Sequence, residues 1–181
     1  MKARLDPTIV TDRLVLRPLR SGDVDDIVAG VGDLAVARML VRVPHPYRRV
    51  QAEDFVAHAR RSALGGQNMI LAIDHGQLNG IVSIEDMPGR CELGYWLARP
   101  AWGRGFATEA ATAILTYGFD ILGLRLVRSA FFAENRGSRG VQRKLGFAVI
   151  GRSERHSLAR GQTAANIDTV LTRARFQALA P

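Results

Sequence analysis

A short glycine-rich stretch, Trp-Gly-Arg-Gly-Phe-Ala-Thr at positions 102–108, carries the clearest chemical signal in this chain of 181 residues. It lies between an apolar segment that ends near Leu97 and a run with helical spacing that begins near Ala107. The start of a helix leaves several backbone N–H groups without an internal partner, and the helix dipole adds partial positive charge. Glycines at 103 and 105 let an anion approach these groups because they carry no Cβ. The stretch therefore predicts a binding site for a phosphate or diphosphate, with Arg104 at its rim.

Two other nucleotide-binding loops fit this stretch less well. A P-loop ends in Gly-Lys-Ser/Thr, and no such sequence follows Gly105. A Rossmann loop has a third small residue where Thr108 stands and an acidic residue about 20 positions further on, a spacing that Glu134 matches only loosely. The first alternative is excluded, and the second stays a minor one.

The elements that must position the loop alternate between strands and helices. Turn-like pairs, His75-Gly76 and Pro88-Gly89, separate the apolar segments between 69 and 97, which predicts a meander of antiparallel hairpins. We find no repeat and no linker, so residues 1–181 are expected to form one domain with a mixed α/β sheet. The predicted strands are 14–18, 69–74, 78–85, 91–97, 126–132, 147–157 and 165–172, and the predicted helices are about 21–31, 50–64, 107–119 and 138–145.

Positive charge is concentrated in one part of the chain. Residues 1–98 carry twelve basic and twelve acidic side chains, whereas residues 99–160 carry eleven basic against four acidic ones. The positive electrostatic field of this segment attracts phosphates, whether of a nucleotide cofactor or of a nucleic acid. A solvated, arginine-rich surface explains the same count equally well.

Two motifs together resemble the GNAT superfamily of acyl-coenzyme A-dependent N-acetyltransferases. The superfamily's diphosphate loop has the form Gln/Arg-x-x-Gly-x-Gly/Ala, and Trp102, Gly105 and Ala107 occupy its defined positions. Trp102 departs from the usual Gln or Arg but is familiar in the branch of ribosomal-protein N-terminal acetyltransferases, whose Gly-Tyr-Trp-Leu and Thr-Glu-Ala segments match 94–97 and 108–110. Asn135-x-x-Ser138 and Lys-Leu-Gly-Phe at 144–147 supply the second motif. The resemblance extends from about residue 11 to about residue 172.

This resemblance implies a GNAT-like fold and acetyl-coenzyme A as acyl donor, with no metal. The fold is a central, mostly antiparallel sheet of six or seven strands with about four flanking helices. Its fourth strand (91–97) and fifth strand (126–132) splay apart to admit the pantetheine arm. Backbone groups of Leu97 and Arg99 would bind the pantetheine amides, and Asn135 and Ser138 would line the other wall. The diphosphate would lie against Trp102, Gly103, Arg104, Gly105, Phe106, Ala107 and Thr108.

The amine that attacks a thioester must be neutral. An α-amine has a pKa of about 8 and a side-chain amine one of about 10.4, so a general base helps to supply the neutral form. Glu92, at the start of the splayed strand, is the first candidate, and Glu85 or Asp86 could share the role. The alternative for Glu92 is a strand-end carboxylate paired with an arginine. Glu85 and Tyr95 are also the predicted contacts of the acceptor, with Tyr95 and Trp96 on opposite faces of their strand.

The thiolate that leaves needs a proton or a hydrogen-bond donor. Many members of the superfamily place a tyrosine seven residues after the asparagine of the second motif, and Gln142 occupies that position here. The resemblance assigns the role of donor to Ser138. The alternative is that Ser138 only caps a helix at 138–145, as serine readily does.

Composition excludes several other classes of protein. One cysteine, Cys91, allows no intrachain disulfide, and the four histidines lack the spacing of metal ligands. The chain has no apolar run of about 18 residues and no apolar N-terminal leader, so we expect a soluble, cytoplasmic protein that does not contact a membrane. Nucleic acid is not the expected partner, because the arginines are not interleaved with exposed aromatic residues on which bases could stack. A homodimer is compatible with the sequence.

The sequence thus predicts an N-acetyltransferase that transfers the acetyl group directly to a primary amine in a ternary complex. A protein N-terminus is the first candidate for the acceptor, and an aminoglycoside, a polyamine-like metabolite or an amino acid is the second. Two alternatives belong to other classes. One is a nucleic-acid-binding module that uses the basic segment. The other is a non-catalytic acyl-coenzyme A-binding protein, an alternative that the missing tyrosine leaves open.

Overall fold

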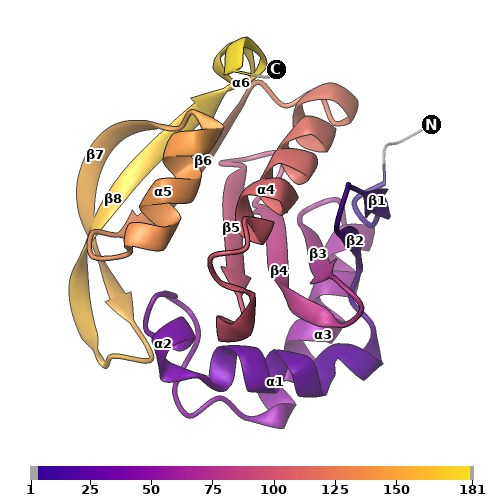
Figure 1. Ribbon diagram of the computed structural model, residues 1–181, viewed down its shortest axis with the longest axis vertical. Coiled ribbons are helices and arrows are strands. Elements are labelled where there is room, and N and C mark those ends of the chain that lie inside the picture. The colour runs from indigo at the N-terminus through magenta and orange to yellow at the C-terminus, as the bar shows by residue number, and fades with distance from the viewer. Residues whose placement is uncertain (1–3, 180–181) are drawn as a thin grey trace.

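One twisted sheet runs through the whole molecule in the computed structural model, which describes residues 4–179 (Figure 1). The strand order is β1-β2-β3-β4-β5-β6-β8-β7, and every neighbouring pair is antiparallel except β5 and β6. The strands are β1 (Ile9–Val10), β2 (Val15–Pro18), β3 (Met69–Asp74), β4 (Leu78–Glu85), β5 (Glu92–Leu97), β6 (Leu126–Phe132), β7 (Ala148–Ser157) and β8 (Gln162–Thr172).

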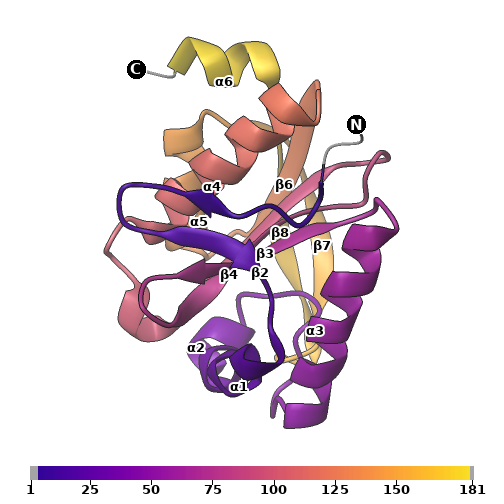
Figure 2. The ribbon, with the colours of Figure 1, turned by 90° about the vertical axis from the view of Figure 1, so that its right-hand side faces the viewer.

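Helices cover both faces of the sheet, as Figure 2 shows. On one face lie α4 (Phe106–Thr116) and α5 (Arg136–Leu145), and the other is covered by α1 (Val24–Gly32), α2 (Leu34–Ala37) and α3 (Arg49–Leu64). The C-terminal α6 (Arg173–Leu179) packs Phe176 against Phe119, with ring centroids 5.3 Å apart. No helix within residues 4–179 is both long and apolar enough to cross a membrane.

The core consists of two apolar clusters, one on each face of the sheet, because successive side chains of a strand point to opposite faces. In β5, Leu93 and Leu97 belong to the apolar cluster under α4, whereas Trp96 belongs to the cluster under α1 and α3. A Cβ at Gly30 of α1 would lie 2.6 Å from the ring of Trp96, so only glycine lets the helix approach this closely. The predicted opposite orientation of Tyr95 and Trp96 is confirmed.

Most of the predicted elements are present, and three strands have the predicted ends: Met69–Asp74, Leu78–Glu85 and Leu126–Phe132. The prediction missed β1, α2 and α6, which are short, so the sheet has eight strands instead of six or seven and six α-helices lie within residues 4–179 instead of about four. The helix predicted at 138–145 begins at Arg136, because the side chain of Asn135 caps it by accepting a hydrogen bond from the backbone N–H of Ser138. The prediction of Ser138 as the cap was therefore wrong.

The sheet splays between β5 and β6. These are the strands predicted as the fourth and fifth, because the short strand β1 was not predicted and adds one to the numbering. These strands are paired at a single position, Glu92 opposite Arg128, where the N–H of Arg128 donates to the carbonyl of Cys91 at 2.9 Å. The Ser129 hydroxyl also donates to the carbonyl of Leu93, at 2.9 Å. Beyond these contacts the strands separate, downward in Figure 1, and leave a free edge on β5.

Candidate active site

The glycine-rich turn at 102–108 joins β5 to α4 at the open end of the splay; residues 102–105 are exposed, whereas Phe106 is buried beneath them. Gly103 and Gly105 have φ angles of 73° and 82°, a region that disfavours residues with a Cβ. In the part of the chain that the structure describes, none of the N–H groups of residues 103–108 has a hydrogen-bond acceptor, and no side chain caps α4. The turn therefore offers a row of free donors at the positive end of a helix dipole.

Two arginines flank this turn. The guanidinium of Arg13 donates to the carbonyl of Arg104 at 2.9 Å and pairs with Glu109 of α4 at 2.6 Å. Burial opposes ionisation of Glu109, but hydrogen bonds from Thr11 and Arg13 outweigh this effect and lower its pKa. Arg104 lies over the ring of Phe106 at 4.4 Å, so its charge stays beside the free donors. The sequence showed Arg104 at this rim but gave no sign of Arg13.

The free edge of β5 presents backbone groups to the splay. Ala98 donates to Asn79 of β4 at 2.8 Å, so by antiparallel alternation Tyr95 and Leu97 direct their N–H and C=O groups away from β4. The carbonyl of Leu97 accepts a hydrogen bond from Trp102 Nε1 at 2.8 Å. Arg99 starts a short 3-10 turn, with its guanidinium 3.8 Å from Asp33. Trp102 thus fastens the glycine turn to the end of β5.

Tyr95 and Ser138 meet on the face of the sheet that α5 covers. The two hydroxyl oxygens are 2.8 Å apart, and Asn135 holds the first turn of α5 beside them. Burial raises the pKa of Tyr95 to about 12, against smaller opposing effects of hydrogen bonds with Ser138 and Gln142. We expected Tyr95 among the acceptor contacts, but its side chain lies with the residues expected to line the cofactor wall.

Gln142, at the position of the family's usual tyrosine, is buried in a polar network. Its Nε2 donates to Ser129 at 2.8 Å and its Oε1 accepts from Thr169 at 2.7 Å. Ser129 in turn donates to the carbonyl of Leu93 on β5. The residue therefore ties α5, β6 and β8 to β5 near the point of divergence.

Glu85 and Glu92 lie on the other face of the sheet and stand opposite each other across β4 and β5. Arg42 pairs with Glu85 at 2.7 Å, and Ser83 donates to the same carboxylate at 2.8 Å. A Cβ at Gly94 would lie 3.0 Å from the hydroxyl of Ser83 and 3.7 Å from the carboxylate of Glu85, so this glycine leaves space over the middle of β5 beside both side chains. Glu92 is exposed and forms no ion pair within 4.0 Å in the described chain.

A strap crosses the splay on this second face, formed by the turn between β7 and β8 and by residues 38–42 (Figure 1). Arg160 donates to the carbonyl of Arg38, pairs with Glu134 at 2.9 Å and lies 4.5 Å from the ring of Phe132. Leu158 donates to the carbonyl of Val41 at 3.1 Å. The sequence showed no sign of these contacts, because they join segments about 120 residues apart.

Cys91 is a poor nucleophile in this setting. It is buried, and burial together with the nearby charge of Asp86 raises the pKa of its thiol. A reactive thiolate needs surroundings that lower the pKa of the thiol. The structure therefore supports the expected role of Cys91 as a small, buried strand residue.

Comparison with known proteins agrees with this geometry. Residues 13–148 match the family model described as the acetyltransferase (GNAT) domain. The chain is 29% identical over 161 residues to the uncharacterized N-acetyltransferase p20 of Bacillus licheniformis, a match that covers 86% of this chain and 90% of that protein.

Solved structures share the fold. The RimJ protein of Mycobacterium smegmatis, in complex with CoA-disulfide, superposes with a TM-score of 0.84 at 20% identity and covers 96% of this chain and 91% of its own. Spermidine N-acetyltransferase from Vibrio cholerae, in complex with CoA and spermine, gives a TM-score of 0.78 at 18% identity, with 92% and 99% of the two chains covered. Since the family model spans most of the sequence, the chain belongs to the acetyltransferase (GNAT) family and is an N-acetyltransferase.

Proposed function

We propose that the chain transfers the acetyl group of acetyl-coenzyme A to a primary amine within a ternary complex. The observation that carries this proposal is the row of free N–H groups at residues 103–108, at the open end of the splay between β5 and β6. A diphosphate bound there would replace water on several donors at once, beside Arg13 and Arg104. A side chain at Gly103 or Gly105 would strain the turn, so the residues fit the group.

The pantetheine arm would bind along the free edge of β5. It would run past the backbone groups of Leu97 and Tyr95, with Asn135 and Ser138 on the opposite wall. This mode resembles the addition of a strand to a sheet edge, in which backbone hydrogen bonds supply much of the affinity. It directs the thioester toward the narrow end of the splay, where Tyr95 and Ser138 meet.

The acceptor would approach from the face that carries Glu85 and Glu92. Glu85 is engaged by Arg42 and Ser83, which leaves Glu92 as the freer carboxylate to accept a proton, directly or through a water molecule. Glu85 would then hold the amine near Gly94. Glu92 first takes one proton from the ammonium group, which leaves a neutral amine. The amine nitrogen then forms a bond to the carbonyl carbon, the carbon–sulfur bond breaks, and the second proton that the nitrogen loses passes to the thiolate or to solvent.

Tyr95 and Ser138 would stabilise the departing thiolate by hydrogen bonding. A thiol has a pKa of about 8.5, so full proton transfer from a tyrosine with a pKa of about 12 is unfavourable by roughly 5 kcal/mol. A hydrogen bond to the thiolate needs no such transfer and contributes about 1.5–3 kcal/mol. The pair therefore acts as a donor, and solvent or the released amine proton neutralises the thiolate.

A protein N-terminus is the acceptor that the chemistry favours. An α-amine with a pKa near 8 is about one-tenth neutral at pH 7, whereas a side-chain amine is neutral in fewer than about one molecule in a thousand. A single exposed carboxylate such as Glu92 is a sufficient base to deprotonate an α-amine, but it is a weak base for a side-chain amine.

Thiol release from acetyl-coenzyme A tests the proposal. The assay compares peptides with free N-termini, the same peptides blocked at the N-terminus, spermidine, an aminoglycoside and a free amino acid. We expect release that depends on the amine and a product with one added acetyl group by mass spectrometry. Absence of release with every amine, despite cofactor binding in calorimetry, would support the non-catalytic alternative instead.

A further inference from the structure

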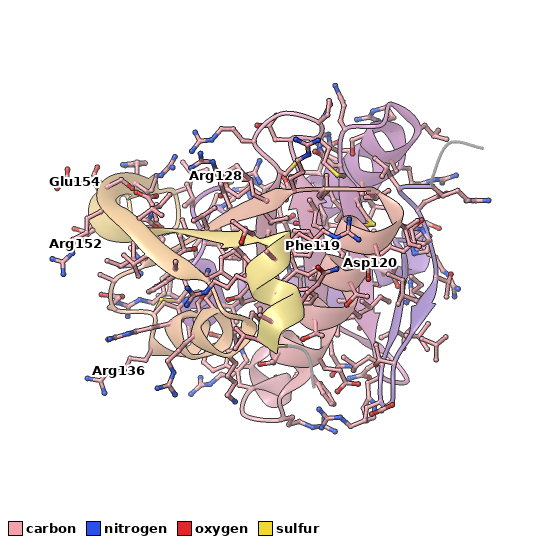
Figure 3. The ribbon with its side chains drawn as sticks, turned by 90° about the horizontal axis from the view of Figure 1, so that it is seen from above. Phe119, Asp120, Arg128, Arg136, Arg152 and Glu154 are labelled. Atoms are coloured by element: carbon pink, nitrogen blue, oxygen red, sulfur yellow. The ribbon has the colours of Figure 1, made fainter. Side chains whose placement is uncertain are left out.

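Four arginines surround the narrow end of the splay, next to Glu92: Arg90, Arg125, Arg128 and Arg155. Ser129 directs its hydroxyl to Gln142 of α5, so alternation along β6 directs Arg128 to the opposite face, the face of Glu92. Figure 3 shows Arg128 on the other side of the sheet from Arg136 of α5. The cluster is therefore on the side from which the acceptor is proposed to enter.

These arginines line two hollows that share Arg90 and Arg128. The first is small and also contains Glu92, Arg155 and Asp168. The second has a volume of about 510 Å³ and continues past Gly89 to the turn at 123–125. Together they form one groove, which we call the arginine groove, leading from Glu92 around the ends of β5 and β6.

The positive charge of the arginine groove exceeds the negative charge in it, with four arginines against the two carboxylates Glu92 and Asp168. Within residues 4–179, the four guanidinium groups form no side-chain hydrogen bond and no ion pair within 4.0 Å, although Glu92 and Asp168 lie in the same hollow. Other arginines of the chain, such as Arg17 and Arg160, have carboxylate partners. A groove that holds four unengaged cations beside a reaction centre is complementary to an anionic part of the acceptor.

We propose that the arginine groove binds acidic side chains close behind the acceptor's amine, so that the acceptor is a polypeptide N-terminus with Asp or Glu among its first residues. This inference rests on the proposed function. A small amine held at Glu92 stays beside the first hollow, which has a volume of only about 20 Å³, whereas a chain of several residues follows the groove past Arg125. The residues that line the second hollow include no aromatic side chain on which nucleic-acid bases could stack.

Matched peptides test the inference. Two peptides share the first residue and differ at positions 3 to 6, which are Glu in one and Gln in the other. The enzymes compared are the wild type, the double variant Arg90→Gln/Arg125→Gln and the control Arg152→Gln. The control removes an exposed positive charge from β7, at the edge of the molecule and away from Arg128 (Figure 3). The readouts are kcat/KM by thiol release and the Kd of coenzyme A by calorimetry.

The wild type should prefer the acidic peptide. In the double variant that preference should fall roughly threefold to thirtyfold, because each exposed pair contributes a small free energy, while the Kd of coenzyme A stays the same. The control should keep the wild-type preference.

Equal kcat/KM of the wild type for both peptides would overturn the inference. An equal loss of the preference for the acidic peptide in Arg152→Gln would also overturn it. In both cases the enzyme would still be an active acetyltransferase, so the proposed function would stand. Stronger inhibition by a single-stranded RNA oligonucleotide than by an acidic peptide of equal charge would assign the groove to nucleic acid and also overturn it. Release of thiol with no amine at all would instead be a failure of the proposed function.

Discussion

The hydroxyl groups of Tyr95 and Ser138 are 2.8 Å apart and join the free edge of β5 to the first turn of α5. Gln142, at the position where many members of the family have a tyrosine, is engaged in a buried network one turn further along the helix. Two residues from distant parts of the sequence thus form the donor pair proposed here.

Tyr95→Phe and Ser138→Ala should each lower kcat about tenfold to a hundredfold, because each removes a hydrogen bond to a charged leaving group. The Kd of coenzyme A should change little. Steady-state kinetics and calorimetry measure both quantities. If the residues act as one unit, the double variant should be no slower than the slower single variant, and fully additive losses would contradict a shared role.

Gly105→Glu should abolish binding of acetyl-coenzyme A, because it adds a negative charge beside the diphosphate and places a side chain at a φ of 82°. Gly66→Glu is the matched control, since Gly66 has a φ of 72° in the turn after α3. Calorimetry of both variants with coenzyme A separates backbone strain from loss of the site. Unchanged affinity in Gly105→Glu would remove the turn from the binding site.

Glu92→Gln should lower kcat/KM about 10²- to 10⁴-fold for an acceptor with an ammonium group. The loss should shrink as the pH rises above the pKa of the amine, since the neutral form then needs no base. Glu85→Gln should instead raise KM for the acceptor, because its carboxylate is held by Arg42 and Ser83. Rate profiles against pH for both variants decide which carboxylate is the base. A larger, pH-dependent loss in Glu85→Gln would reverse the two roles.

Arg160→Ala should raise KM for the acceptor and reduce the free energy of unfolding by about 1–3 kcal/mol, since it removes one of the two arginine partners of Glu134 and leaves the carbonyl of Arg38 without its donor. The Kd of coenzyme A should not change, because the strap lies on the other face. Arg152→Ala, an exposed change on the same strand pair, should alter none of these values. An unaltered acceptor KM in Arg160→Ala would show that the strap serves only stability.

Asp23→Asn should destabilise the fold by about 2–4 kcal/mol at pH 7, because Arg17 would lose the more deeply buried of its two carboxylate partners and keep only Asp74. Burial opposes ionisation of Asp23, yet hydrogen bonds from Arg17 and from the N–H of Arg20 lower its pKa below the ordinary 3.8. A depressed pKa means that this contribution is present at pH values above 3.8 and is lost as the pH falls through the lower, folded-state value. Urea denaturation at pH 7 and at acid pH should show the two proteins converging, and a constant difference would contradict the assignment.

Local patterns determined much of the fold and the place of the cofactor loop. The long strands Met69–Asp74 and Leu78–Glu85 were predictable because apolar runs between turn residues need no distant partner to be recognised. The glycine turn was predictable for the same reason, since its conformation depends on Gly103 and Gly105 themselves. Short elements such as β1 and α2 were missed because tertiary contacts, and not their own periodicity, stabilise them.

By itself, the sequence determined the family, the order of the long elements and the glycine turn at 102–108, all of which depend on neighbours within a few positions. Only the tertiary structure decided which side chains share a site. It brought Tyr95 to Ser138, placed Arg13 beside Arg104, and set Glu85 against Arg42 instead of leaving it free. These contacts depend on strand alternation and on the divergence of β5 from β6, and such long-range geometry leaves no trace in local spacing.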